Sequence, residues 1–218
     1  TPPTHNLHSN PRIGKRGGGV AIFVNKKLES KCLKIPSFET FEAILVSVSF
    51  TKSTVNFVSF YRPPATKFQL FLDEFCSLLE LLASRPSPFI ICGDFNIHID
   101  VNSANTTQFL ELLESWDLIQ HVNFFTNNYY HTLDLLLSQS SSNLINNTRK
   151  SEAFCDHCSV LATLNTISVP VENVKQVNYR AFHLINLENF KQDISDSNLC
   201  NNPCSTPHGL YNQYHSTL

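Results

Sequence analysis

Runs of apolar residues, separated by polar ones, predict a series of short strands in the first half of the chain. Three runs rich in β-branched and aromatic residues predict strands at 20–24, 41–50 and 55–61. The last two flank the polar residues 51–54, so we predict that they pair as an antiparallel hairpin. Residues 89–92 form another short apolar run, which is typical of a buried central strand.

Two segments have apolar residues at helical spacing. Between residues 68 and 83 they recur every three or four positions, which predicts a helix that packs on the sheet through a stripe of Phe and Leu. A second helix is predicted to begin with Thr106 or Thr107 as its N-cap and to place Phe109 on its inner face. Strands that alternate with helices in this way predict an α/β fold.

The last part of the chain contains fewer predicted elements. Residues 131–137 and 159–163 are predicted strands, and 143–150 is predicted to be a loop. From about residue 165 the composition shifts to Asn, Ser, Gln and Pro, and only 179–194 has a helical pattern. We therefore expect 1–165 to be one domain and 166–218 to be a mostly irregular linker.

Composition excludes several classes of protein. The 218 residues are 42% hydrophobic with 17 Phe, enough for one domain with a sizeable core. No apolar run approaches the roughly 20 residues that a membrane span needs, so we expect no membrane association. Seven cysteines, an odd number that lies largely within apolar runs, indicate reduced thiols and an intracellular protein of the nucleus or cytoplasm. We expect a monomer, and the lack of Met indicates a fragment or processed piece.

Net charge gives no general reason to expect nucleic acid binding, but its distribution is uneven. The chain carries −2 overall, with a sequence pI of about 6.5. Residues 12–34 contain seven basic residues and one acidic residue, a net of +6, which leaves −8 for the remainder. A basic patch beside a polyanion site fits this pattern, although a solvated charged face is the commoner explanation.

The predicted central strand runs directly into candidate chemistry at Gly93, Asp94 and Asn96. Residues i and i+2 of an extended segment point the same way, so Asp94 and Asn96 should face one side while Phe95 enters the core. The carboxylate could take a proton from water or hold a cation, and the amide could donate to a phosphoryl oxygen. The alternative is an Asx turn that closes the strand.

The strand at 55–61 ends in a second candidate group. Pro63 and Pro64 should hold Tyr61 and Arg62 in extended geometry at the rim of the sheet, where a phenol and a guanidinium could bind phosphate. The alternative is a strand-ending Tyr with a surface Arg. Gly17–Gly19 could also cradle phosphate, but they lead into a strand and lack the Lys-Ser/Thr of a P-loop.

Two further segments contain polar residues in unusual positions. Asp134 lies inside an apolar run, where a carboxylate is costly unless it is paired or liganded. Asp156 and His157 stand at the start of the strand predicted at 159–163. His157 could meet a phosphate as imidazolium, and Asp134 is the kind of carboxylate that orients such a ring.

Together these motifs resemble the endonuclease/exonuclease/phosphatase superfamily, and more closely the apurinic-type endonuclease domain of non-LTR (LINE-like) retrotransposons. They occur in the family's order over about residues 1–165, whereas 166–218 is similar to the segment that joins this domain to a reverse transcriptase. The motifs are Arg16-Gly-Gly-Gly-Val-Ala-Ile22, Tyr61-Arg-Pro-Pro64, Gly93-Asp-Phe-Asn96 followed by Ile97-His98, His131-Thr-Leu-Asp134, and Asp156-His157.

The resemblance implies a four-layer α/β sandwich of two mixed β-sheets flanked by helices, here missing its first strands. In the family those strands end in a catalytic Asn and a metal-binding Glu, and nothing before Gly17 matches either. Glu29, Glu39 and Glu42 follow the glycine motif and are poor substitutes for that Glu. The family also has Ser where this chain has Cys155, a small change.

The activity implied is metal-assisted hydrolysis of a phosphodiester, used by the retrotransposon relatives to nick DNA. Asp94 would orient or deprotonate the attacking water, Asn96 would hold the phosphate, and His157 with Asp134 would stabilise the developing charge. Tyr61 would contact the phosphate or the leaving oxygen.

The same resemblance implies ligands and partners. Mg²⁺, with Mn²⁺ as a substitute, would be held by Asp94 and Asp156. Arg62 and Thr132 would contact phosphate or substrate. DNA and an adjacent reverse transcriptase are the expected partners. Two alternatives remain: an inactive remnant without the metal-binding Glu, and a superfamily phosphatase with a substrate other than nucleic acid.

Overall fold

The chain forms two compact units, Thr1–Glu172 and Asn173–Leu218, in a computed structural model. Each unit is described by itself. The structure describes residues 2–12, 18–51, 53–153, 155–165 and 186–217.

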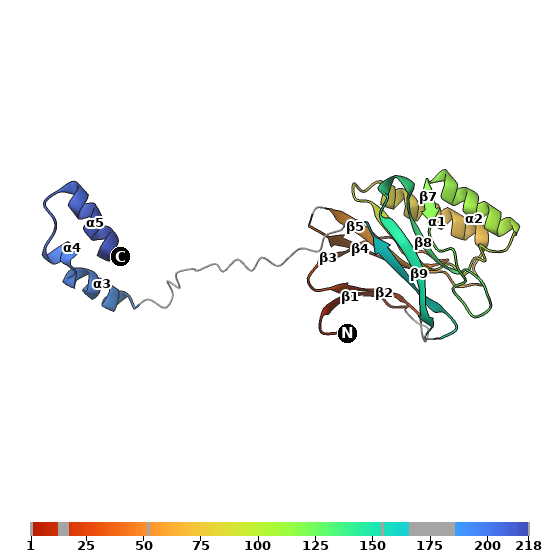
Figure 1. The fold of residues 1–218 in the computed structure, drawn as a ribbon, viewed down its shortest axis with the longest axis horizontal. Helices are drawn as coiled ribbons and strands as arrows, with labels where there is room; N and C mark the ends of the chain where they lie inside the picture. Colours follow the sequence, from red (N-terminus) through yellow and green to blue (C-terminus); the bar gives the residue numbers. More distant parts are fainter. Residues whose placement is uncertain (1, 13–17, 52, 154, 166–185, 218) are drawn as a thin grey trace. The chain divides into compact units, whose positions relative to one another are not determined.

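A mixed six-stranded sheet is the centre of the first unit (Figure 1). All neighbouring strands pair antiparallel except β5 and β6, which are parallel. The predicted antiparallel hairpin is therefore confirmed as β4 and β5, and the predicted central strand lies inside the sheet as β6. In spatial order the strands are β3 (Glu29–Leu33), β4 (Glu42–Ser49), β5 (Thr54–Tyr61), β6 (Phe89–Asp94), β8 (Asp134–Gln139) and β7 (Leu118–Gln120).

Two helices cover one side of this sheet, which we call the helix face (Figure 1). They are α1 (Phe68–Ala83), which has the predicted bounds, and α2 (Ala104–Ser115). Ser103 caps α2 by accepting the Thr106 N–H. The predicted N-cap, Thr106 or Thr107, is therefore wrong, because the helix begins about one turn earlier. The main core lies here, where Phe side chains of the sheet and the helices pack at ring separations such as 4.2 Å between Phe60 and Phe95.

Two antiparallel pairs of strands pack on the opposite side, the hairpin face. They are β1 (His5–Asn10) with β2 (Val20–Asn25), and β9 (Ile145–Ala153) with β10 (Cys158–Leu164). The α/β class with a mixed sheet flanked by helices is confirmed, and the two pairs occupy the place of the second sheet. The prediction of a loop at 143–150 is wrong, because the residues from Ile145 onward form β9. A short 3-10 turn (Ser140–Ser142) precedes β9.

The described residues of the second unit, 186–217, are largely helical where mostly irregular structure was predicted, and their first helix overlaps the one predicted at 179–194. The unit contains α3 (Leu187–Asp196), α4 (Asn198–Asn201) and α5 (Pro207–Thr217). Asn186 caps α3 by accepting the N–H groups of Glu188 and Asn189. The first part of the helix predicted at 179–194 lies outside the described residues. Among the helices that the structure describes, none has the length and apolar character required to span a membrane.

Candidate active site

The predicted residues Tyr61, Asp94 and Asp134 form a row across three neighbouring strands at one end of the sheet. Tyr61 of β5 is the register partner of Asp94 in β6, and Asp94 is the partner of Asp134 in β8. Successive side chains of a strand alternate between faces. Asp94 therefore shares the hairpin face with Ile90, and Asp134 shares it with Leu136, both of which pack against β9 and β10.

Gly93 allows β5 and β6 to approach each other closely at this end. Its φ is +150°, and a Cβ there would lie 1.8 Å from the carbonyl oxygen of Phe60. No L side chain fits that space, so the close approach of the two backbones requires glycine at position 93.

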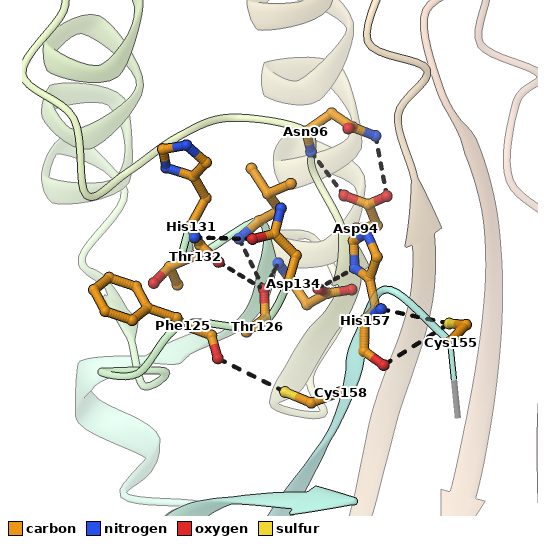
Figure 2. Close-up of polar contacts among 12 residues, drawn as sticks. Asp94, Asn96, Phe125, Thr126, His131, Thr132, Asp134, Cys155, His157 and Cys158 are labelled. Atoms are coloured by element: carbon orange, nitrogen blue, oxygen red, sulfur yellow. Dashed lines mark hydrogen bonds and ion pairs between the residues drawn. The ribbon is translucent and has the colours of Figure 1, made fainter. Parts of the chain in front are cut away.

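The Asp94 carboxylate is held by Asn96. Oδ1 accepts the Asn96 backbone N–H at 3.0 Å, and Oδ2 accepts the Asn96 side-chain amide at 3.0 Å (Figure 2). The first bond closes an Asx turn, and Asn96 adopts a positive φ of 49°. The turn and the chemical interpretation of this segment are thus compatible, because the turn itself orients the carboxylate.

Asn96 differs from its predicted role. Its Nδ2 donates to Asp94 and also to the carbonyl oxygen of Arg62 at 2.7 Å. Both of these partners are acceptors, so the amide nitrogen, and not the amide oxygen, faces them. Both N–H groups of the amide are therefore used. Asn96 therefore positions Asp94 in this structure and has no side-chain N–H left for a phosphate.

Arg62 and Thr132 are also corrected as phosphate contacts. Arg62 follows Tyr61 and points to the other face, where it is 4% exposed and its guanidinium lies over Phe71 at 4.9 Å. It donates to the carbonyl oxygens of Phe95 and Asn96 at 3.1 and 3.2 Å, so it supports the turn from beneath. Thr132 is 5% exposed, and its hydroxyl donates to a backbone carbonyl.

His157 and Asp134 form the predicted pair. The ring Nδ1 of His157 donates to Asp134 Oδ2 at 2.7 Å, which fixes the ring and leaves Nε2 as the other polar atom (Figure 2). Burial lowers the pKa of His157, but the hydrogen bond and charge of Asp134, aided by Asp94 and Asp156, outweigh it and raise that pKa. The pair therefore favours imidazolium.

The surroundings of Asp94 favour its neutral form, whereas those of His157 favour the charged form. Burial raises the pKa of Asp94, and the nearby Asp134 charge adds to this, against the lowering effects of Asn96 and His157. A carboxylate with a raised pKa accepts a proton more readily near neutral pH. A candidate base and a candidate cationic group thus lie at the same end of the sheet. We call Asp94, Asp134 and His157 the hydrolase site, after the activity that the sequence resemblance implies.

Sequence reasoning missed Thr126, which fixes the start of β8. The residue is fully buried, and its hydroxyl accepts the N–H groups of Leu133 and Asp134 at 3.0 and 3.1 Å. Its carbonyl accepts the Cys158 N–H at 2.7 Å, so one residue connects the start of β8, where Asp134 lies, to the start of β10, which directly follows His157. Thr126 lies in a polar and aromatic loop, and no local pattern marks it.

Glu42 extends the row at its other end, as the register partner of Tyr61. Its carboxylate pairs with Arg12 and accepts the Gly19 N–H at 2.7 Å. The Arg12 guanidinium lies 5.6 Å from the centre of the Tyr61 ring. The glycine segment therefore holds a carboxylate of the protein itself, and Glu42 is occupied by this ion pair.

The oxygen donors of the site suit a hard divalent cation. Asp156 is exposed next to His157, and Asp94 lies within the row. Mg²⁺ is commonly bound by one or two carboxylates and keeps several waters, so two carboxylates are the right type of ligand for it. Asp94 and Asp156 are the residues that would hold it.

A family described as endonuclease-reverse transcriptase matches residues 55–161. Its match contains every residue of the hydrolase site. No curated protein matches the sequence.

Solved structures share the fold at low sequence identity. The endonuclease domain of TRAS1, a telomere-specific non-LTR retrotransposon, aligns with a TM-score of 0.64 and 16% identity over 74% of this chain and 80% of that one. The human Nocturnin catalytic domain with bound sulfate gives 0.52 and 16% over 73% of each chain. D. rerio TDP2 with a single-strand DNA product gives 0.53 and 13% over 75% and 78%. These structures show that the chain shares their fold, and the family match over residues 55–161 agrees with the predicted superfamily.

Proposed function

We propose that this chain is a member of the endonuclease/exonuclease/phosphatase superfamily that hydrolyses phosphodiester bonds of DNA with a divalent metal ion and acts as a nicking endonuclease of the retrotransposon type. The observation that carries the proposal is the hydrolase site, in which Asp94 and Asp134 are register partners and Asp134 holds His157. The family match and the TRAS1 endonuclease fold support the nucleic acid branch over a phosphatase.

Asp94 serves as the base in this proposal. Its raised pKa suits proton transfer from the attacking water, and its two bonds from Asn96 fix the direction of the carboxylate. Arg62 adds a support, because it holds the backbone of the same turn from the helix face. These contacts preorganise the site before substrate binds.

His157 stabilises negative charge on the phosphoryl oxygens. Asp134 occupies Nδ1, so Nε2 is the atom that donates to the substrate. The raised pKa keeps the ring cationic over a wider pH range than a free imidazole. Tyr61, in the same row, contacts the phosphate or the leaving oxygen.

Asp94 and Asp156 would bind the metal ion, Mg²⁺ or Mn²⁺. When bound there, such an ion polarises the phosphoryl group and helps the leaving oxygen depart. Asp156 is close enough to His157 for its charge to raise the pKa of that ring.

Nicking of supercoiled plasmid with Mg²⁺ tests the proposal. We expect wild-type protein to produce open circles and both Asp94→Asn and His157→Ala to slow nicking by about 10²–10⁴-fold, as for loss of a catalytic acid or base. Glu111→Gln, which removes an exposed carboxylate on α2, is the matched control and should nick at the wild-type rate.

The other two predicted alternatives give different results. An inactive remnant produces no nicking with wild-type protein despite a folded circular dichroism spectrum. A phosphatase leaves plasmid intact but releases phosphate from a phosphomonoester, and that release depends on Asp94. Either result would overturn the proposal that this chain is an endonuclease.

A further inference from the structure

A second group of metal-ligand residues lies beside the hydrolase site. His98 and Asp100 follow β6, and His131 precedes β8. Each offers one ligand atom, and these atoms all lie within 4.8 Å of one another. Among the described residues, no other set of three His, Cys, Asp or Glu residues meets this geometry.

The three residues are held in place by bonds to their surroundings. Asp100 Oδ1 accepts the Thr132 N–H at 2.8 Å. Within the group, Oδ2 accepts His131 Nδ1 at 2.8 Å, and a metal ion held by these two atoms would replace the proton of that bond. The His131 backbone N–H donates to the Asn127 side chain at 2.9 Å. The His98 carbonyl accepts the hydroxyl of Thr106 in α2. Such outer contacts orient first-shell ligands in known metal sites.

The rings and the carboxylate suit a transition metal. The His98 and His131 rings are 4.2 Å apart, edge to face, with the Asp100 carboxylate against one of them. Two imidazoles and a carboxylate favour Zn²⁺ or Co²⁺ over Mg²⁺, which prefers oxygen.

The group is separate from the hydrolase site, although its loops continue directly from the strand ends that carry Asp94 and Asp134. Figure 2 shows the His131 ring directed away from Asp94, Asp134 and His157. His98 and His131 line a cavity of about 440 Å³ that also borders Asn96 and Arg62. An ion at this place would tie the loop after β6 to the loop before β8.

We propose that His98, Asp100 and His131 form a Zn²⁺ site, with the remaining coordination positions open to water, that joins these two loops. The site differs in donor chemistry from the one at Asp94 and Asp156. It does not depend on the proposed function, because metal binding can be measured without nicking.

Titration of chelator-treated protein with Co²⁺ tests the site. We expect visible d–d absorption bands with one equivalent, their loss on addition of Zn²⁺, and a rise in the melting temperature with Zn²⁺. His98→Ala and Asp100→Asn should each weaken Co²⁺ binding by more than about 100-fold, since a lost ligand costs more than a lost outer contact. His131→Ala should do the same.

Two variants serve as controls. Asp94→Asn should keep the Co²⁺ bands, and so should His208→Ala, which removes an exposed His of the second unit. If wild-type protein gives no bands, or if His98→Ala gives the wild-type titration, the group is an ordinary Asp–His ion pair only and the proposal is overturned. His98 is exposed, so its substitution decides the matter even if His131→Ala fails to fold. Intact nicking in that case would leave the proposed function standing.

Discussion

The two faces of the six-stranded sheet are built differently although the same strands supply both. The helix face carries one continuous core, in which Phe60, Phe71, Phe75 and Phe95 pack ring against ring. The hairpin face is divided into two smaller clusters, one under β1–β2 and one under β9–β10. The polar row with the hydrolase site lies on the hairpin face. A dense core on one side thus allows charged residues on the other.

The largest expected effect compares two Phe residues of β5 that point to opposite faces. Phe60→Ala should lower the free energy of unfolding by about 3–5 kcal/mol, because the cavity opens in the dense core. Phe57→Ala should lower it by about 2 kcal/mol or less, because Phe57 is only partly buried on the hairpin face. Urea unfolding of both variants measures the difference. Equal losses would contradict the distinction between the faces.

Arg62 links the two faces, and its replacement is the next test. Arg62→Lys keeps the charge but cannot reach the carbonyl oxygens of both Phe95 and Asn96 in the same way. Leaving a buried carbonyl unpaired costs about 1–3 kcal/mol, so we expect a loss of stability in that range and slower nicking. Arg149→Lys on exposed β9 is the control. A variant as stable and active as wild type would show that Arg62 does not support the turn.

The hairpin face should respond to pH through His157. Its pKa is raised in the folded protein, so the protonated ring contributes stability below the ordinary pKa of about 6.5, and this is lost as pH rises through the folded value. Asp134→Asn removes the main raising influence. We expect the His157 pKa, followed by NMR of its ring protons, and the alkaline limb of nicking both to move to lower pH.

Asp156→Asn is the matched comparison for this shift. Asp156 acts on His157 through its charge without a hydrogen bond to the ring, so its removal should move the pKa in the same direction but by less. An unchanged His157 titration in Asp134→Asn would mean that the pair does not control the ring.

The smallest effect is expected at the start of α2, on the helix face. Ser103→Ala removes the side chain that accepts the Thr106 N–H and should cost about 1 kcal/mol in thermal or urea unfolding. Thr107→Ala removes an exposed hydroxyl that donates a hydrogen bond to the Ser103 carbonyl oxygen, and this change should cost less. A larger loss for Thr107→Ala would restore the cap predicted from the sequence.

Much of the fold followed from local patterns. The bounds of α1, the β4–β5 hairpin and the central strand β6 were predictable because apolar spacing reflects burial directly. The polar strands β1 and β9 were not, because their residues face outward and their pairing depends on partners distant in the chain. Beyond residue 186, α3 overlaps the helix predicted at 179–194, whereas α5 was missed because its composition is typical of loops.

The sequence by itself determined which residues are the candidates for chemistry: Asp94, Asp134 and His157 stand at or next to strand ends, where their polarity is unexpected. Only the tertiary structure decided what their neighbours do. It turned Arg62 inward, used both amide protons of Asn96, and brought Thr126 under Asp134. The physical reason is that a residue's type is local, whereas the direction of its side chain and the identity of its hydrogen-bond partner depend on strand register and on loops that meet only in the folded chain.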